Sequence, residues 1–358
     1  MDNSLLRWIG DEAVLQQFMS GLSAPTLLAI IAVCVVLLSK GADWMIDGVV
    51  DLAERTGMPK IVIGATVVSL GTTLPEAFVS VMAAVMGNPG LALGNGVGSI
   101  IADTGLIFGL TCVLVSVPVN HYILNRTGWV QVGAATLLVI IALAAWQQNP
   151  DAPMLGRGVG FSFLLLLLVY LYVTYVWARQ GADMVPGEAE TSPADEVMST
   201  ARSWLLIIGG LFMVIAGARV LVPGASEIAV RFGVPDDVIA ATIVALGTSL
   251  PELMTAIAAI RKGQPEITVG NIVGADVLNC LFVIGAAAAA APLAIPDNFY
   301  YFHFPAMLVI LYSFRAFISM NSAGVFYRWQ GIWLLSVYAG YVILQYALNV
   351  GSPHAVAP

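Results

Sequence analysis

"IGATVVSLGTTLPEAF", residues Ile63 to Phe78, is repeated 176 residues later as "IAATIVALGTSLPELM", residues Ile239 to Met254. The match continues without a gap, and over residues 63–109 the two copies are identical at 18 of 47 positions. Chance similarity between segments rich in Leu, Ala and Val would not align Gly, Pro, Glu and Asn in register. The chain is therefore expected to contain two copies of one structural unit.

The composition predicts an all-α polytopic membrane protein. Hydrophobic residues make up 59% of the 358 residues, charged residues only 10%, and the mean hydropathy is +0.89. Soluble domains carry roughly a quarter charged residues. A crossing needs about 20 apolar residues. Apolar runs bounded by charge, Gly or Pro predict ten transmembrane helices, at residues 26–50, 60–85, 91–116, 127–147, 158–178, 203–229, 236–260, 267–291, 300–320 and 329–349.

Five predicted spans separate the two copies, so the second copy crosses the membrane in the opposite sense. This predicts a 5+5 inverted repeat, an architecture found in many secondary transporters. The expected segments are an N-terminal segment (1–25), a first five-helix repeat (26–178), a cytoplasmic linker (179–202), a second five-helix repeat (203–350) and a C-terminal tail (351–358).

Lys and Arg residues indicate the orientation, because they are enriched in cytoplasmic loops. An even number of spans places both termini on one side. The loops of the other side carry Arg55, Lys60, Arg126, Arg179, Arg202, Arg261, Lys262, Arg315 and Arg328, whereas the side of the termini carries Arg7, Arg157 and Arg231. We therefore expect both termini outside and the acidic 179–202 loop in the cytoplasm, as a flexible linker.

Glu76 and Glu252 occupy equivalent positions near the middle of predicted spans. A charged side chain there costs about 2.5 to 3.5 kcal/mol on insertion scales. The inverted repeat predicts that the two carboxylates face each other at the bilayer midplane, where they would repel one another. This arrangement indicates that a cation occupies the site during part of a functional cycle.

The residues before each Glu predict a break in the helix. Pro75 and Pro251 lack the N–H group that would bond the carbonyls of Gly71 and Gly247. We expect broken helices at "GTTLPE" and "GTSLPE", with backbone oxygens available beside the hydroxyls of Thr72, Thr73, Thr248 and Ser249. Broken helices at membrane depth are tolerated where protein encloses them or where they line a cavity.

The following span of each copy adds a second polar set. Asn95, Ser99 and Asp103 share one helix face, as do Asn271, Ala275 and Asn279 in the second copy. Gly94, Gly98, Gly270 and Gly274 should let these faces approach the broken helices closely. Asn95 and Asn271 either ligate an ion or hold helices together. Without His or thiolate at these positions, the set suits hard cations such as Ca²⁺ or Na⁺.

"GTTLPE…GNGVGS" and "GTSLPE…GNIVGA" resemble the two alpha-repeats of the cation/calcium exchanger superfamily, particularly its sodium/calcium exchanger branch. The resemblance covers both repeats, the ten-span inverted layout and the outside termini. It implies that Ca²⁺ is coordinated by Glu76, Glu252 and the backbone at Thr72 and Thr248. It also implies that the exchanging Na⁺ is bound with the help of Thr73, Ser99, Ser249, Asp103 and Asn279.

The sequence also departs from that family pattern. Where members commonly read Gly-Ser-Asn, the copies read Gly98-Ser99-Ile100 and Gly274-Ala275-Asp276. Ala275 lacks a hydroxyl that a sodium site would use, and Asp276 is a fourth possible carboxylate, one residue off the Asn271–Asn279 face. The acid at Asp103 and the amide at Asn279 reverse the placement expected in sodium/calcium exchangers. These changes concern the identity and number of the exchanged ions.

We therefore expect a secondary active antiporter that exchanges Na⁺ for Ca²⁺ by alternating access, and not an enzyme. Calcium/proton exchange, or exchange of another monovalent cation for protons, is the alternative. An intramembrane hydrolase with paired acids is a remote one. The expected partners are small inorganic cations and the lipid bilayer, with no nucleic acid, and no cofactor is expected beyond the transported Ca²⁺ and Na⁺. The sequence does not indicate an oligomeric state.

The first and sixth spans are long, contain glycine and are poor in polar groups near their middle. We expect them to move as a pair that opens the site alternately to each side, while the motif helices stay comparatively fixed. Gly41 and Gly217 align between the copies. They either permit this sliding or mark a static close contact between helices.

Overall fold

The computed structural model describes residues 12–56, 58–85, 87–184, 199–232, 247, 249–321 and 324–347, and they are almost entirely helical. The first half contains α2 (Glu12–Ser20), α3 (Ala24–Thr56), α4 (Lys60–Ile63), η1 (Gly64–Val68), α5 (Ser69–Thr72), α6 (Leu74–Val85), α7 (Pro89–Ala102), η2 (Asp103–Phe108), α8 (Gly109–Leu114), β1 (Val117–Pro118), α9 (His121–Gln148), β2 (Met154–Leu155) and α10 (Arg157–Met184). The second half contains α11 (Thr200–Arg231), α14 (Leu250–Arg261), α15 (Pro265–Leu278), η4 (Asn279–Val283), α16 (Ile284–Ala290), β3 (Leu293–Ala294), η5 (Phe299–His303), α17 (Phe304–Met320), β4 (Val325–Phe326) and α18 (Arg328–Ala347).

The helices repeat with the period found in the sequence. Four pairs of elements begin 176 residues apart, namely α3 and α11, α6 and α14, α7 and α15, and the π-helical segments η2 and η4. The all-α fold and its twofold internal repeat are therefore confirmed at the level of secondary structure.

Seven helices within the described ranges are long and apolar enough to cross a membrane, and the bent pair Lys60–Thr72 and Leu74–Val85 makes an eighth candidate. Helices α14 and α18 lie where the seventh and tenth spans are predicted, and the predicted seventh span extends into residues 236–246, outside the described ones. The total of ten crossings therefore stays a prediction.

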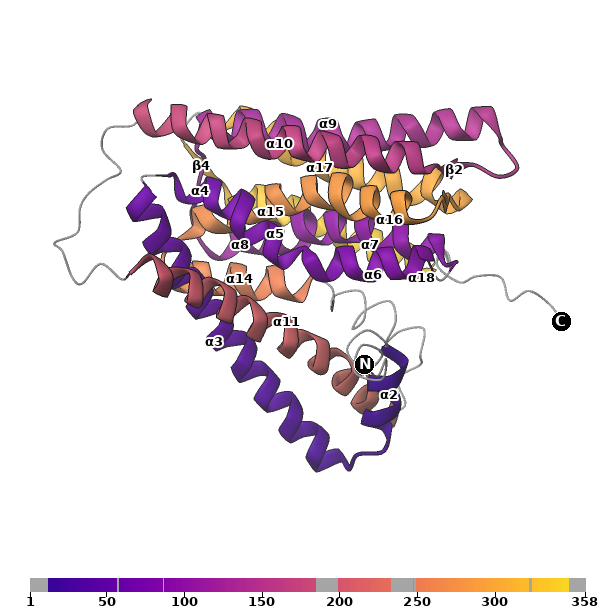
Figure 1. Cartoon of the computed structure of the whole chain (residues 1–358), viewed down its shortest axis with the longest axis horizontal. Coiled ribbons are helices and arrows are strands. Elements are labelled where there is room, and N and C mark those ends of the chain that lie inside the picture. Colours follow the sequence, from indigo (N-terminus) through magenta and orange to yellow (C-terminus); the bar gives the residue numbers. More distant parts are fainter. Residues whose placement is uncertain are drawn as a thin grey trace.

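Figure 1 shows how these helices are layered. Helices α3 and α11 lie side by side, inclined to the rest of the molecule, and they form the most extensive helix pair. Helices α9 and α10 cover the opposite side of the motif helices. Two short antiparallel ribbons join the halves, because β1 pairs with β4 and β2 pairs with β3. Each ribbon thus takes one strand from each repeat.

The glycines of α15 let it approach the first broken helix closely, as predicted. A Cβ atom at Gly64 would lie 2.6 Å from the carbonyl oxygen of Ile267. Cβ atoms at Gly270 and Gly274 would collide with the carbonyl oxygens of Ile61 and Ala65. We expected Gly94 and Gly98 to contact the second broken helix in the same way. The part of that helix that would contact them lies outside the described residues, so this expectation stays a prediction.

Gly41 mediates a close contact within the inclined pair. A Cβ atom at Gly41 would lie 2.7 Å from the carbonyl oxygen of Gly210 on α11, and one at Gly217 would lie 3.0 Å from the side chain of Leu38 on α3. Of the two roles expected for these glycines, the structure supports close packing of α3 against α11.

Arg315 differs from the other basic residues assigned to loops, because it is buried well inside a helix. Arg315 was expected in a loop but lies inside α17, buried with its guanidinium 4.5 Å from the centre of the Trp129 ring. The ring face and the Ser319 hydroxyl, which accepts a 2.8 Å hydrogen bond, stabilise the charge there. The helix ends at Met320, where the predicted ninth span ends.

The close packing of α15 gives a first prediction. Gly270→Ala should destabilise the protein by about 1 to 3 kcal/mol or more, because backbone lies where the new methyl group must go. Gly133→Ala on α9 is the control, since no described atom lies within 4 Å of its Cβ position. Thermal unfolding in detergent should show a lower midpoint for Gly270→Ala alone. Equal midpoints would contradict the packing described.

Candidate cation-binding site

The first motif helix breaks where its sequence predicts. Helix α5 ends at Thr72, helix α6 begins at Leu74, and the two parts of the span are bent by 42°. Pro75, in the first turn of α6, has no N–H group to continue the hydrogen bonding of the preceding helix. In the second copy α14 begins at Leu250, directly after Ser249, whereas Thr248 lies outside the described residues.

The two motif glutamates lie close together in the interior. Glu76 and Glu252 are each only 1% exposed, and no described residue donates a hydrogen bond to either carboxylate. The carboxylates of Glu252, Glu76 and Asp103 interact electrostatically with one another. Like charges that interact in a low-dielectric interior repel one another strongly. The site therefore favours a positively charged guest.

Hydroxyl and amide groups from both repeats surround the glutamates. The Thr72 hydroxyl donates to Asn271 Oδ1 over 3.3 Å, and it also lies next to Glu252. The Ser249 side chain lies next to Asp103. Residues of one repeat therefore stand beside carboxylates of the other, as an inverted repeat requires.

Asn95 holds the first glutamate in place through the backbone. Its amide nitrogen donates to the Glu76 carbonyl oxygen over 3.1 Å and to Ser80 Oγ over 2.9 Å. These bonds tie α7 to α6 beside the carboxylate, which is the helix-holding role expected as one of two alternatives. Direct ligation by Asn95 or Asn271 stays a prediction.

The other predicted ligands are buried with oxygens that make no hydrogen bond to described residues. They are Thr73 Oγ1, Ser99 Oγ, both Asp103 oxygens, Ser249 Oγ and Asn279 Oδ1. Asp103 and Asn279 begin the π-helical segments η2 and η4 at equivalent positions. Such local widening of a helix is frequent at functional sites. Hydrophobic periodicity alone could not predict it.

Sequence reasoning missed two residues that contact the fourth carboxylate. Gln131 Nε2 and Thr104 Oγ1 each donate to Asp276 Oδ2 over 2.5 Å. Gln131 lies inside the predicted span 127–147, about one turn from its start, and a polar amide within an apolar span was a signal that could have identified it. Thr104 directly follows Asp103.

The donor set fits a hard cation as cargo, because carboxylate, hydroxyl and amide oxygens are the ligands that Ca²⁺ and Na⁺ prefer. Among the described residues, no three acidic, His or Cys side chains converge closely enough to enclose a metal ion. An ion bound between the glutamates would therefore need neutral oxygens as well.

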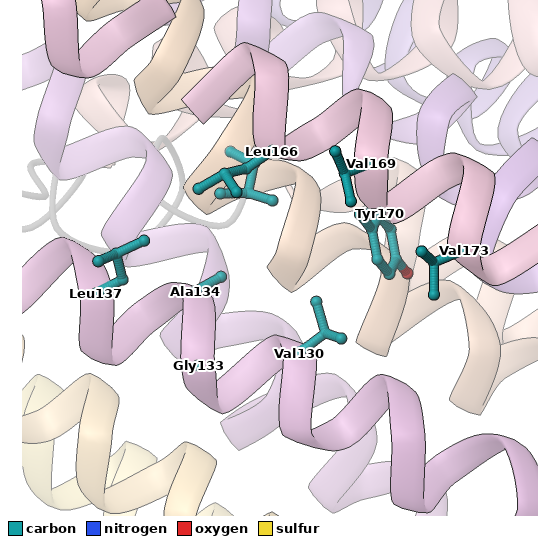
Figure 2. Close-up of a pocket in the computed structure, with 9 residues that line it drawn as sticks. Val130, Gly133, Ala134, Leu137, Leu166, Val169, Tyr170 and Val173 are labelled. Carbon is teal, nitrogen blue, oxygen red and sulfur yellow. The ribbon is translucent and has the colours of Figure 1, made fainter. Parts of the chain in front are cut away.

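A separate cavity of about 280 Å³ does not fit such an ion. Figure 2 shows its walls, formed by Val130 and Leu137 of α9 and Leu166 and Val169 of α10, and Leu281 also lines it. Its lining is almost wholly apolar and includes none of the candidate ligands. Apolar walls cannot replace the hydration shell of a cation.

The Asn95 contacts give a second prediction. Asn95→Ala should cost about 1 to 3 kcal/mol, because the buried Glu76 carbonyl loses its extra donor and the α6–α7 contact is lost. Ser80→Ala removes only one of the two acceptors and should cost less. Thermal unfolding of both variants and of the double variant measures the coupling. Equal effects of the two single variants would contradict the role given to the Glu76 carbonyl.

The family described as "Sodium/calcium exchanger protein" matches residues 26–176 and 202–347, which correspond to the two repeats. The chain is 33% identical to the inner membrane protein YrbG of Escherichia coli over 79% of this chain and 85% of that protein. It is 26% identical to the sodium/calcium exchanger MaX1 of Methanosarcina acetivorans, over 86% and 95% of the two chains.

A solved structure of the sodium-calcium exchanger NCX_Mj, soaked with Na⁺ and Sr²⁺, has a similar fold. It superposes with a TM-score of 0.74 at 26% identity, covering 91% of this chain and 99% of that one. The family match extends over both repeats, and its ranges include the buried glutamates Glu76 and Glu252. The chain therefore belongs to the sodium/calcium exchanger family.

Proposed function

We propose that the protein is a secondary active antiporter that exchanges Na⁺ for Ca²⁺ by alternating access. The observation that carries this proposal is the pair of repeat-related glutamates, buried side by side without a cationic side chain bound to them among the described residues. The names of MaX1 and NCX_Mj, to which the chain is similar, support the same ions. The proposal makes the protein a transporter and not an enzyme.

Electrostatics explains why two different ions can share one site. A divalent ion between Glu76 and Glu252 balances both charges, and it attracts each carboxylate twice as strongly as a monovalent ion at the same distance. Monovalent ions must therefore bind in greater number, using additional oxygens nearby. Asp103, which interacts with both glutamates, supplies such oxygens.

We assign the ligands accordingly. Ca²⁺ would be held by Glu76, Glu252 and the backbone at Thr72 and Thr248. Na⁺ would use Thr73, Ser99, Ser249, Asp103 and Asn279, with Asn95 and Asn271 orienting the neighbouring groups or joining the ligands. Binding one set excludes the other, because both draw on the same carboxylates, and this exclusion couples the two fluxes.

The orientation is also proposed from charge. Helices α3, α9 and α11 carry Arg55, Arg126 and Arg202 near those helix ends that face the predicted cytoplasmic side. This distribution supports outside termini and a cytoplasmic 179–202 linker between the two five-helix repeats. A protein inserted in this way would release cytoplasmic Ca²⁺ to the outside when Na⁺ flows inward.

Reconstituted vesicles test the function directly. Vesicles loaded with Na⁺ and diluted into a Na⁺-free medium of equal ionic strength should accumulate ⁴⁵Ca²⁺, and adding Na⁺ outside should release it. Uptake that follows an imposed pH gradient and ignores Na⁺ would support proton coupling instead. Peptide cleavage without any ion flux would support a hydrolase.

Neutralising either glutamate should abolish exchange. We expect Glu76→Gln and Glu252→Gln each to lower Na⁺-driven ⁴⁵Ca²⁺ uptake by more than about a hundredfold, because each removes half of the charge facing the divalent ion. Size-exclusion profiles should remain those of folded protein, since neither carboxylate is bonded to a described residue. Wild-type rates of ⁴⁵Ca²⁺ uptake in both variants would contradict the assignment of the two glutamates as ligands.

Asp103 should matter more for the coupling ion than for Ca²⁺. Asp103→Asn is expected to raise the Na⁺ concentration for half-maximal exchange by about tenfold, because a charged ligand becomes neutral. The apparent affinity for Ca²⁺ should change less. Initial rates measured over a range of Na⁺ and of Ca²⁺ separate the two. A larger loss in Ca²⁺ affinity would move Asp103 into the calcium site.

The inclined pair α3 and α11 is our candidate for the moving part. The two helices pack against each other through their glycines. Lys262, which follows α14, forms a 2.5 Å ion pair with Asp47 of α3. Cross-linking Asp47→Cys to Lys262→Cys with a short bismaleimide should stop exchange while ion binding from the open side survives. Undiminished exchange in fully cross-linked protein would rule out this movement. The unlinked double variant is the control.

A further inference from the structure

Asp276 lies at a meeting point of three helices outside the glutamate pair. It belongs to α15, is 1% exposed, and receives hydrogen bonds at Oδ2 from Thr104 of η2 and Gln131 of α9. The charged neighbour that interacts with it is Asp103, another acid. The ion pairs seen between described residues, Arg55–Asp51, Arg231–Glu227 and Lys262–Asp47, do not involve Asp276.

Two oxygens of this cluster have unused capacity. Asp276 Oδ1 and Gln131 Oε1 are both buried and make no hydrogen bond with the described residues. They belong to side chains in direct contact, because Gln131 Nε2 bonds to the other Asp276 oxygen. A buried carboxylate oxygen and a buried amide oxygen without donors are costly, and each is a good ligand for a hard cation.

The internal repeat shows that the fold does not require polar groups here. The positions that correspond to Asp276, Thr104 and Gln131 in the other repeat are Ile100, Cys280 and Met307, and all three are buried. The equivalent location in the other repeat is therefore packed with apolar side chains. A cluster that were only a helix contact could be built in the same way, and at lower cost than a buried acid.

We propose that Asp276, Gln131 and Thr104 form a second, off-centre cation site that binds Na⁺. One carboxylate with neutral amide and hydroxyl oxygens matches a single positive charge. When the site is empty, the Gln131 amide nitrogen satisfies the carboxylate. When Na⁺ enters, rotation of the amide by half a turn presents Oε1 to the ion in place of the N–H donors. The proposal rests on the proposed function, since it adds one Na⁺ to the ions that the exchanger handles.

Asp103 connects this site to the central one. It interacts with Asp276 on one side and with Glu76 and Glu252 on the other. Sodium bound at Asp276 would lower the negative potential at Asp103 and so weaken Ca²⁺ binding between the glutamates. The off-centre site would thereby help Na⁺ to displace Ca²⁺ without contacting it.

The test isolates the off-centre site by neutralising all three acids of the central one. The thermal unfolding midpoint of purified Glu76→Gln/Asp103→Asn/Glu252→Gln protein is measured without Ca²⁺, while Na⁺ replaces N-methylglucamine at constant ionic strength. A bound ion stabilises the folded state in proportion to the logarithm of its concentration. We expect Na⁺ to raise the midpoint in this background. Adding Asp276→Asn should abolish the response or shift it to at least about tenfold higher Na⁺.

Two further variants keep the test decisive if Asp276→Asn fails to fold. Thr104→Cys and Gln131→Met introduce the residues of the apolar counterpart, and each should weaken the Na⁺ response in the same background. Thr111→Val is the matched control, because its buried hydroxyl bonds only the Ile107 carbonyl of its own helix. A Na⁺ response that persists in all the cluster variants, or a midpoint that depends on pH alone, would overturn the proposal. Cluster variants that lower the unfolding midpoint equally with and without Na⁺ would also overturn the proposal.

The result is independent of the exchange assay. If wild-type vesicles show no Na⁺-driven ⁴⁵Ca²⁺ flux but the Asp276-dependent Na⁺ response is present, the proposed function fails and the site stands. If exchange is present and the response is absent, the site fails alone.

Discussion

Electrostatic repulsion between acids that have no basic partner among the described residues shapes the centre of this molecule. Glu76, Glu252 and Asp103 interact with one another in the interior, and Asp276 interacts with Asp103. A single Ca²⁺ would balance only two of these four formal charges. The remaining charge needs further cations or protons, and an unloaded site is unfavourable in a low-dielectric surrounding. The same property that makes the site costly makes it a receptor for cations that come and go.

The surrounding fold keeps these acids close together in spite of their repulsion. Gly270 and Gly274 bring α15 against the first broken helix, and the Asn95 amide fixes the backbone of Glu76. Two ribbons, each with one strand from each repeat, hold the halves in a fixed relation. These contacts agree with the proposal that the four motif helices stay comparatively fixed during transport. Helices α3 and α11 form a separate inclined pair in Figure 1.

Much of this arrangement was predictable from the sequence because the repeat is explicit. The 176-residue period makes α14 the counterpart of α6 in the second repeat. Pro75 and Gly71 predict the break that ends α5 at Thr72. The π-helical segments at Asp103 and Asn279 were not predictable, since one extra residue in a turn leaves no hydrophobic signature. Gln131 was missed because it belongs to no motif and its counterpart in the repeat is Met307. Its importance depends on a contact with Asp276, 145 residues away, which only the fold reveals. The family resemblance supplied the ion identities, and they did not follow from residue spacing.

Two of the four buried acids have no acidic counterpart in the other repeat. Asp103 is paired with Asn279, and Asp276 with Ile100, so the two repeats offer unequal charge to the same central space. Such inequality gives different ions different preferred positions around one shared pair of glutamates. The central claim is that Na⁺ and Ca²⁺ compete for that pair. Equilibrium binding of ⁴⁵Ca²⁺ to the purified protein, at constant ionic strength and rising Na⁺, tests this claim most directly. We predict that Na⁺ raises the apparent Kd for Ca²⁺ progressively without changing the number of sites. Calcium binding that saturating Na⁺ leaves unchanged would contradict it.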